Sequence, residues 1–157
     1  RSSELAKAQF ENGSDIVFAA AGASGLGALQ AAADTGNFGI GVDANQNYLH
    51  PGHMLTSMVK RVDVAIYKVL ESSKNGTFKG GIQSLGLAEN GVGWALDEYN
   101  AHLITDAMKS AVAKARDGWR RLWNLGLARR CTAPKMISPV TPSCGPVGFH
   151  GVVFKKT

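Results

Sequence analysis

The chain has 157 residues, enough for one domain with its own core, and its hydrophobic fraction of 45% is ordinary for a globular protein. The formal net charge of +5 is unevenly spread: residues 1–118 carry 10 Lys and Arg against 12 Asp and Glu, whereas residues 119–157 carry 7 Lys and Arg and no acid. Because the larger part is mildly acidic, the basic balance does not support a nucleic-acid-binding domain.

The first quarter of the chain has the pattern of a βαβ unit. Short apolar runs alternate with helical spacing and are separated by glycines, as in buried parallel strands joined by a helix. A glycine-rich turn, Gly22–Gly27, follows the first strand, and Asp43 ends the second. The predicted elements are a helix over 3–12, a strand over 15–20, a helix over 26–34 and a strand over 38–42.

The middle of the chain predicts one long helix. After a polar loop and a short strand over 54–56, Ser57 is in place to cap a helix that runs from Met58 to about Lys74. Asn75-Gly76 ends it. Its apolar positions form one stripe, made of Val59, Val62, Ile66, Val69 and Leu70.

The next elements are a hairpin and a second amphipathic helix. Strands are predicted over 82–87 and 92–96, with Glu89-Asn90-Gly91 as the turn between them. The helix follows over 103–116 and is expected to end at Gly118. Its inward positions are predicted to be Ile104, Ala107, Met108, Ala111 and Ala115.

The composition changes after Gly118. Two of three tryptophans, four of five prolines and both cysteines, Cys131 and Cys144, fall in residues 119–157. We therefore divide the chain into a body over 1–118 and a basic tail over 119–157. Two interpretations of the tail stay open: a partly disordered native tail, or a segment that is not native to the body. The two cysteines are candidates for a disulfide but do not establish one.

The chain shows no membrane-spanning run and no signal peptide. Its longest apolar stretch, Ile16–Ala21, is too short to span a bilayer. It opens at Arg1 directly on a helical pattern, which indicates a fragment of a longer protein.

The glycine-rich turn is the first candidate binding element. Backbone N–H groups at the start of a helix donate to anions or hydroxyls. Gly22 and Gly25 would let a ligand approach closely, and Ser24 can cap the helix. The spacing is G-x-x-G-x-G and not G-x-G-x-x-G, and a turn that merely needs small residues has the same pattern.

Three charged residues complete the set of candidates. Asp43 ends a strand 18 residues after Gly25, where a carboxylate would accept hydrogen bonds from both hydroxyls of a ribose; a turn aspartate is the alternative. Lys60 and Arg61 are expected in the first turn of the long helix, where cations oppose the helix dipole. Residues that break a local rule are candidates for function, and a solvated face is the alternative.

Other chemistry is not supported by the sequence. His50 and His53 have no third ligand nearby, so no metal site is expected. The motifs of nucleophilic hydrolases, zinc proteases and P-loop enzymes are missing, and no cofactor is expected. Tyr48 and Trp94 could stack on a base, although packing is the commoner role. From the residues alone, two classes of protein stay open: a binding protein and a nicotinamide-dependent reductase.

Longer strings favour the binding protein. They resemble, in order, segments of the basic membrane protein (PnrA-like) family. The matching strings are Gly13–Gly22 with Gly25-Leu26-Gly27, Gly39–Asp43 with Gln46, Leu55–Asp63, Phe78–Gly81 and Gly91–Gly93. A reductase is not expected to carry the second, third and fourth of these strings.

The resemblance implies a fold, a ligand and a partner. Members have an α/β fold of the type I periplasmic-binding-protein class, in which two lobes close on a purine nucleoside for an ABC transporter permease. This chain would be part of one lobe, a Rossmann-like parallel sheet flanked by helices. By resemblance, Asp43 would take the ribose hydroxyls, Lys60 would contact the sugar and Gly22 would line the pocket with its backbone. The family's lipid anchor and most of its first lobe have no counterpart here. A sugar-responsive regulator domain shares the fold and is a third alternative.

Overall fold

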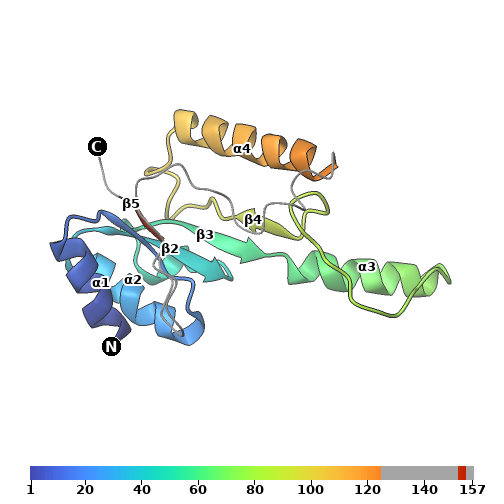
Figure 1. Cartoon of the computed structure of the whole chain (residues 1–157), viewed down its shortest axis with the longest axis horizontal. Helices are drawn as coiled ribbons and strands as arrows, with labels where there is room; N and C mark the ends of the chain where they lie inside the picture. Colours follow the sequence, from blue (N-terminus) through green and yellow to red (C-terminus); the bar gives the residue numbers. More distant parts are fainter. Residues whose placement is uncertain (125–151, 155–157) are drawn as a thin grey trace.

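The computed structural model describes residues 1–124 and 152–154, and its centre is a five-stranded mixed sheet in the order β4-β3-β2-β1-β5 (Figure 1). The strands β1, β2 and β3 are parallel, and β4 and β5 are antiparallel edge strands. The strands are β1 (Ile16–Phe18), β2 (Phe38–Asp43), β3 (Met54–Lys60), β4 (Val92–Trp94) and β5 (Val152–Phe154). The helices are α1 (Ser2–Glu11), α2 (Gly25–Asp34), α3 (Val62–Lys74) and α4 (Asp106–Asn124), with short 3-10 turns η1 (Gly22–Ser24) and η2 (Asn47–Leu49).

The core lies between the sheet and the helix pair α1–α2. These two helices lie together on one side of the sheet, and α4 lies on the other (Figure 1). Leu29 of α2 is 1% exposed and packs with Val17 of β1 and Met54 of β3. A Cβ at Gly39 would stand 2.7 Å from a Leu29 methyl, so this glycine lets α2 approach β2 closely. The predicted α/β class and the predicted βαβ unit are confirmed.

The prediction that Ser57 caps a helix from Met58 is wrong. The short strand predicted over 54–56 extends to Lys60 as β3, and α3 begins only at Val62, with Arg61 as its N-cap. Residues 56–59 pair in register with 40–43 of β2, and Ser57 is fully buried. The ladder hydrogen bonds to β2 stabilise the extended chain here and override the helical spacing.

The apolar stripe of α3 faces solvent in this chain. No residue of α3 is buried, and the helix extends beyond the end of the sheet (Figure 1). Val62, Ile66 and Leu70 are 59%, 56% and 63% exposed. The predicted stripe is therefore confirmed only in part: Val59 lies in β3, and the positions from Val62 onward lie on α3 with no residue of this helix buried.

The hairpin and the last helix also differ from prediction. Residues 82–87 form no strand; the turn near Asn90 exists, but β4 pairs with β3 instead. Helix α4 starts at Asp106 and continues through Gly118 to Asn124. Of the residues expected inward, Ile104 precedes the helix and is half-buried, and the others are exposed, such as Met108 at 47%. A single glycine costs a helix only about 1 kcal/mol, which the flanking turns offset.

The basic tail is described only in part. The body's predicted boundary at 118 falls inside α4, and residues 152–154 pair with β1 as β5. The candidate disulfide between Cys131 and Cys144 lies outside the described residues. None of the helices in the described ranges is long and apolar enough to cross a membrane.

Candidate functional site

Three predicted site segments meet at one edge of the sheet. The carboxyl ends of β1, β2 and β3 lead into the turn at Gly22, into Asp43 and into Lys60 respectively. Because these strands are parallel neighbours, the segments that follow them lie at the same edge. Ligands of open α/β sheets bind at this edge.

Asp43 and Lys60 form an ion pair. The Nζ atom of Lys60 lies 2.6 Å from Oδ1 of Asp43, and the side chains are 57% and 50% exposed. Each residue is the last of its strand, and Asp43 lies opposite Val59 in the ladder. Lys60 is therefore not in the first turn of a helix, as predicted, but ends a strand one residue before the N-cap of α3. Its position beside Asp43 results from strand register.

Asp43 has a left-handed backbone conformation, with φ of 70°. This conformation is uncommon for residues other than glycine, although Asp and Asn tolerate it best. It turns the chain sharply out of β2, so that the N–H of Ala44 donates to the carbonyl of Val42 at 2.9 Å. The carboxylate is thereby directed to the end of β3.

A hydrogen-bond network holds the turn that follows Asp43. Gln46 Oε1 accepts the N–H of Val42 at 2.9 Å, and the N–H of Gln46 donates to Ser57 Oγ at 2.9 Å. Ser57 Oγ donates to Asn47 Oδ1 at 2.8 Å. Ser57 and Asn47 are both 0% exposed. These groups tie the end of β2 to β3, and thus fix Asp43 relative to Lys60.

The network continues into the loop after β4. Asn47 Nδ2 donates to Asp97 Oδ2 at 3.0 Å, and Asn45 Nδ2 donates to the same oxygen at 2.7 Å. Burial alone would raise the pKa of Asp97. The hydrogen bonds from Asn45 and Asn47 and from backbone N–H groups outweigh burial, so the pKa of this carboxyl lies below its ordinary value.

The two glycines of the glycine-rich turn are required for different reasons. Gly22 is exposed with φ of 54°, so its backbone conformation favours glycine. Gly25 is buried, and a Cβ there would lie 2.7 Å from the carbonyl oxygen of Ala19, so packing explains this glycine. Ser24 is the N-cap of α2 but makes no side-chain capping hydrogen bond, contrary to expectation. Ser24 is exposed at the carboxyl edge of the sheet.

Arg61 forms an ion pair with Asp63, two residues along the chain. Its guanidinium donates to both carboxylate oxygens of Asp63, with Nη2 2.8 Å from Oδ2. The hydrogen bond raises the pKa of Arg61 and lowers that of Asp63. This local pair supports the interpretation of Arg61 as a solvated residue and leaves Lys60 as the cation beside Asp43.

The remaining candidates do not form a site together. His53 Nδ1 lies 3.1 Å from the carbonyl oxygen of Asn37, at the other end of β2 from Asp43. Within residues 1–124 and 152–154 no group of three metal-ligating side chains occurs. Tyr48, in η2, is 58% exposed, whereas Trp94 is half-buried opposite Met58.

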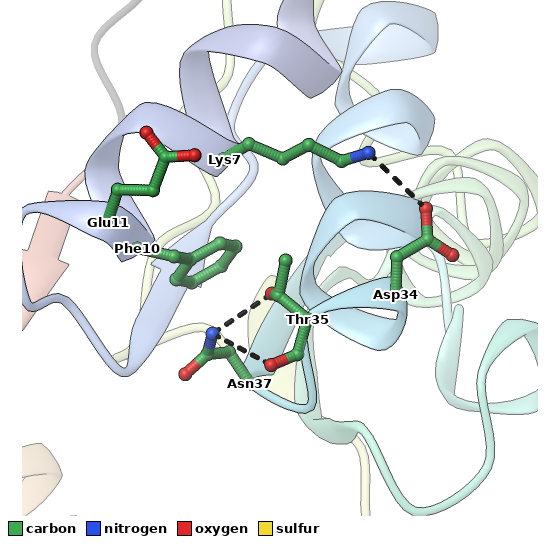
Figure 2. A pocket seen from close by; sticks show the side chains of 6 residues that line it. All are labelled: Lys7, Phe10, Glu11, Asp34, Thr35 and Asn37. Carbon is green, nitrogen blue, oxygen red and sulfur yellow. Dashed lines mark hydrogen bonds and ion pairs between the residues drawn. The ribbon is translucent and has the colours of Figure 1, made fainter.

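A separate hollow of ≈ 340 Å³ lies at the opposite ends of the strands (Figure 2). Lys7 and Asp34 face each other across it at 3.9 Å, and Asn37 donates to Thr35 Oγ1 at 2.9 Å. Because Asn37 precedes β2 and Asp43 ends it, the hollow and the ion pair lie at opposite ends of that strand. We place the candidate site at Asp43, because the hollow lies at the amino ends of the strands, away from the edge where such sheets bind ligands.

Sequence reasoning missed Asn47, Asp97 and Asn100. All three are polar; Asn47 begins η2, Asp97 and Asn100 lie in the loop after β4, and Asn47 and Asn100 are fully buried. Their hydrogen-bond partners lie between 2 and 52 residues away in the sequence, and the Asn45–Asp97 contact is the most distant. The matching string ending at Gln46 was the nearest available signal.

Comparison with known proteins gives a consistent answer. The sequence pattern of the family described as "ABC transporter substrate-binding protein PnrA-like" matches residues 1–117. Basic membrane protein D of Borreliella burgdorferi is 42% identical over 93 residues, which cover 57% of this chain and 27% of that protein. An uncharacterized lipoprotein of Pyrococcus abyssi is 39% identical over 94 residues, covering 55% and 23%. The chain thus spans about a quarter of the length of these relatives.

Two solved structures share the fold. An ABC transporter solute-binding protein from Aeropyrum pernix K1 superposes with a TM-score of 0.52 at 28% identity, covering 82% of this chain and 42% of that one. A transcriptional activator of the comK gene from Bacillus halodurans superposes with a TM-score of 0.66 at 21% identity, covering 74% and 40%. The second likeness concerns the fold alone.

Proposed function

Because the chain belongs to the PnrA-like family of ABC transporter substrate-binding proteins, we propose that it carries part of the site with which such a receptor captures a purine nucleoside for uptake. The observation that carries this proposal is the Asp43–Lys60 pair. It lies at the carboxyl edge of the sheet, half exposed, with its two charged atoms 2.6 Å apart.

The chemistry of the pair suits a ribose. A carboxylate has two acceptor oxygens and can receive both hydroxyls of a vicinal diol, while the ammonium of Lys60 has three donors for sugar oxygens. With the ammonium on Oδ1, the second carboxylate oxygen of Asp43 is available to a ligand hydroxyl. An ion pair this exposed separates at little cost, so a ligand can insert between its members.

The turn after β1 supplies a second kind of contact. The first N–H groups of the helical stretch that starts at Gly22 have no helical acceptor, so they can donate to a ligand at this edge. Gly22 adds no side chain between backbone and ligand, and the hydroxyl of Ser24 is exposed beside it. We propose that Gly22 and Ser24 contact the ligand and that Gly25 supports them by packing.

The function is capture without chemistry. The family is one of binding proteins, so we propose no catalytic residue and no cofactor. The partners proposed are the nucleoside and a transporter permease, without nucleic acid. Several relatives are named lipoproteins, and we propose the same membrane-anchored, extracytoplasmic location for the protein to which this chain belongs.

Thermal melting tests the proposal. The midpoint is measured for this chain with guanosine, inosine, adenosine, ribose and NADPH, each in excess. A ligand that binds only the folded state stabilises it by about 2.7 kcal/mol at a hundredfold excess over Kd. We expect nucleosides to raise the melting midpoint of the wild type and of Asp34→Ala, and to leave the midpoint of Asp43→Ala unchanged.

Asp34 is the matched control because it is also an exposed aspartate paired with a lysine, but at the opposite ends of the strands. A rise with NADPH alone would favour a nicotinamide-dependent oxidoreductase. A rise with nucleosides that survives in Asp43→Ala would remove Asp43 from the site.

A further inference from the structure

We infer that Asp97 is a positioning residue for this site: from the loop after β4, it holds the turn after β2 so that Asp43 faces Lys60. The inference rests on the proposed function for the identity of the ligand. For the contacts themselves it rests on hydrogen-bond geometry alone.

Asp97 binds the turn through one carboxylate oxygen and its own loop through the other. Oδ2 accepts the side-chain amides of Asn45 at 2.7 Å and Asn47 at 3.0 Å. Oδ1 accepts the N–H of Tyr99 at 3.0 Å. Asp97 therefore holds two neighbouring residues of the turn from one point outside it, 54 positions after Asp43 in the sequence.

The contact reaches Asp43 through two buried side chains. Asn47 Oδ1 accepts a hydrogen bond from the hydroxyl of Ser57 at 2.8 Å, and Ser57 Oγ accepts one from the N–H of Gln46 at 2.9 Å. Gln46 accepts the N–H of Val42, the residue before Asp43. Ser57 lies three residues before Lys60 in β3, so the same chain of hydrogen bonds serves both members of the ion pair.

Asp97 is itself fixed by the sheet. Its N–H donates to Asn100 Oδ1 at 2.9 Å, and Asn100 Nδ2 donates to the carbonyls of Leu55 at 2.7 Å and Ala95 at 3.0 Å. Asn100 is fully buried. The loop after β4 is therefore held against the sheet, and through Asp97 it fixes the position of the turn after β2 relative to β4.

The role requires a carboxylate. A single oxygen of Asp97 accepts two amide donors, and the other accepts a backbone N–H. An asparagine has one acceptor oxygen, and its NH2 group would face at least one of these donors. An alanine would remove all three acceptors and leave the buried amide of Asn47 without its partner.

The test compares Asp97→Asn and Asp97→Ala with the control Glu98→Ala, which removes the adjacent, exposed carboxylate. Without ligand, NMR measures amide hydrogen exchange at Val42 and Gln46 and the three-bond HN–Hα coupling of Asp43, which reports its φ. We expect exchange at both amides to rise about tenfold to a hundredfold, the factor that a hydrogen bond to a charged group is worth. The Asp43 coupling should change as well, while exchange in β1 and α2 stays as in the wild type.

Guanosine titration of the same proteins, well below their melting midpoints, supplies the second readout. We expect Kd to rise about tenfold or more in both Asp97 variants and to be unchanged in Glu98→Ala. If Asp97→Ala does not fold, Asn45→Ala, which removes one exposed donor to Asp97, takes its place with a smaller effect in the same direction.

Wild-type exchange and an unchanged Asp43 coupling in folded Asp97 variants would overturn the positioning role. So would exchange that rises equally throughout the sheet, because that result means general destabilisation. If wild-type protein does not bind guanosine, the proposed function fails, and the ligand-free measurements still decide whether Asp97 positions Asp43.

Discussion

The carboxylate of Asp43 and the ammonium of Lys60 are 2.6 Å apart, although each belongs to the end of a different parallel strand. A pair with this exposure adds at most about 1 kcal/mol to stability. The left-handed backbone of Asp43 costs about 1–2 kcal/mol. The stability that the ion pair adds therefore does not offset this cost, and we propose that the arrangement serves ligand binding.

Replacing Asp43 by glycine should separate stability from binding. Asp43→Gly removes the strained Cβ at φ of 70° but also the carboxylate. We expect the free energy of unfolding to stay the same or to rise by up to about 1 kcal/mol, because the relief of strain is partly offset by the flexibility of glycine in the unfolded chain. Nucleoside binding should be lost. Urea unfolding and calorimetric titration measure the two effects.

Asn90→Gly is the control for this variant, since Asn90 is the other non-glycine residue with positive φ in the described chain. It should show a similar change in stability with binding retained. A loss of several kcal/mol in Asp43→Gly would show that the carboxylate stabilises the fold.

A methyl group at Gly41 should disrupt the network behind the site. A Cβ there would lie 2.6 Å from Ser57 Oγ and 2.8 Å from Gln46 Oε1. We expect Gly41→Ala to lower the free energy of unfolding by about 1–3 kcal/mol. Gly93→Ala is the matched strand variant, because no atom lies within 4 Å of its added Cβ. Equal stability of the two variants, measured by urea unfolding, would contradict the packing described around Ser57.

The stripe on α3 should contribute little to the stability of this chain. Ile66 is 56% exposed, and a polar substitution such as Ile66→Lys should change the free energy of unfolding by less than about 0.5 kcal/mol. Leu29→Ala, at 1% exposure, should cost about 2–5 kcal/mol. A loss above 2 kcal/mol in Ile66→Lys would mean that residues outside the described ranges, or a second molecule, cover this helix.

Acid should weaken the support from Asp97. Its folded-state pKa lies below the ordinary value of 3.8, so its contribution is fully present above that value and is lost as the pH falls through the folded-state pKa. Asp97→Asn lacks this titration. The stability difference between wild type and Asp97→Asn should therefore shrink between pH 5 and pH 2–3, within about the range of these pKa values. A difference that grows on acidification would contradict the assigned hydrogen bonds.

Local patterns predicted the first three strands and two helices because their signals are short-range. The apolar run at Ile16–Phe18 and the glycines around α2 correctly indicated a buried strand, a turn and a helix. Residues 57–60 were assigned to a helix because their spacing fits one. Their true partner is β2, and pairing between strands is not visible in the spacing of a single segment.

The site was only partly predictable for the same reason. Asp43 and Lys60 were identified, but for Lys60 the physical argument placed the residue on the wrong kind of element. The residues that orient them, Asn47 and Asp97, are 50 positions apart and carry no motif. Whether an asparagine between two strands is exposed or, like Asn47, fully buried depends on the fold, and the sequence alone did not distinguish these two cases.

Whether Asp43 and Lys60 bind a nucleoside is tested most directly by a residue-resolved NMR titration of this chain with guanosine, which detects binding even when it is weak. We expect the largest chemical-shift changes at Gly22, Ser24, Asp43 and Lys60, and we expect these changes to be lost in Asp43→Ala. Shifts centred on Lys7 and Asp34 at the opposite ends of the strands, or no shifts at millimolar guanosine, would contradict the proposed site.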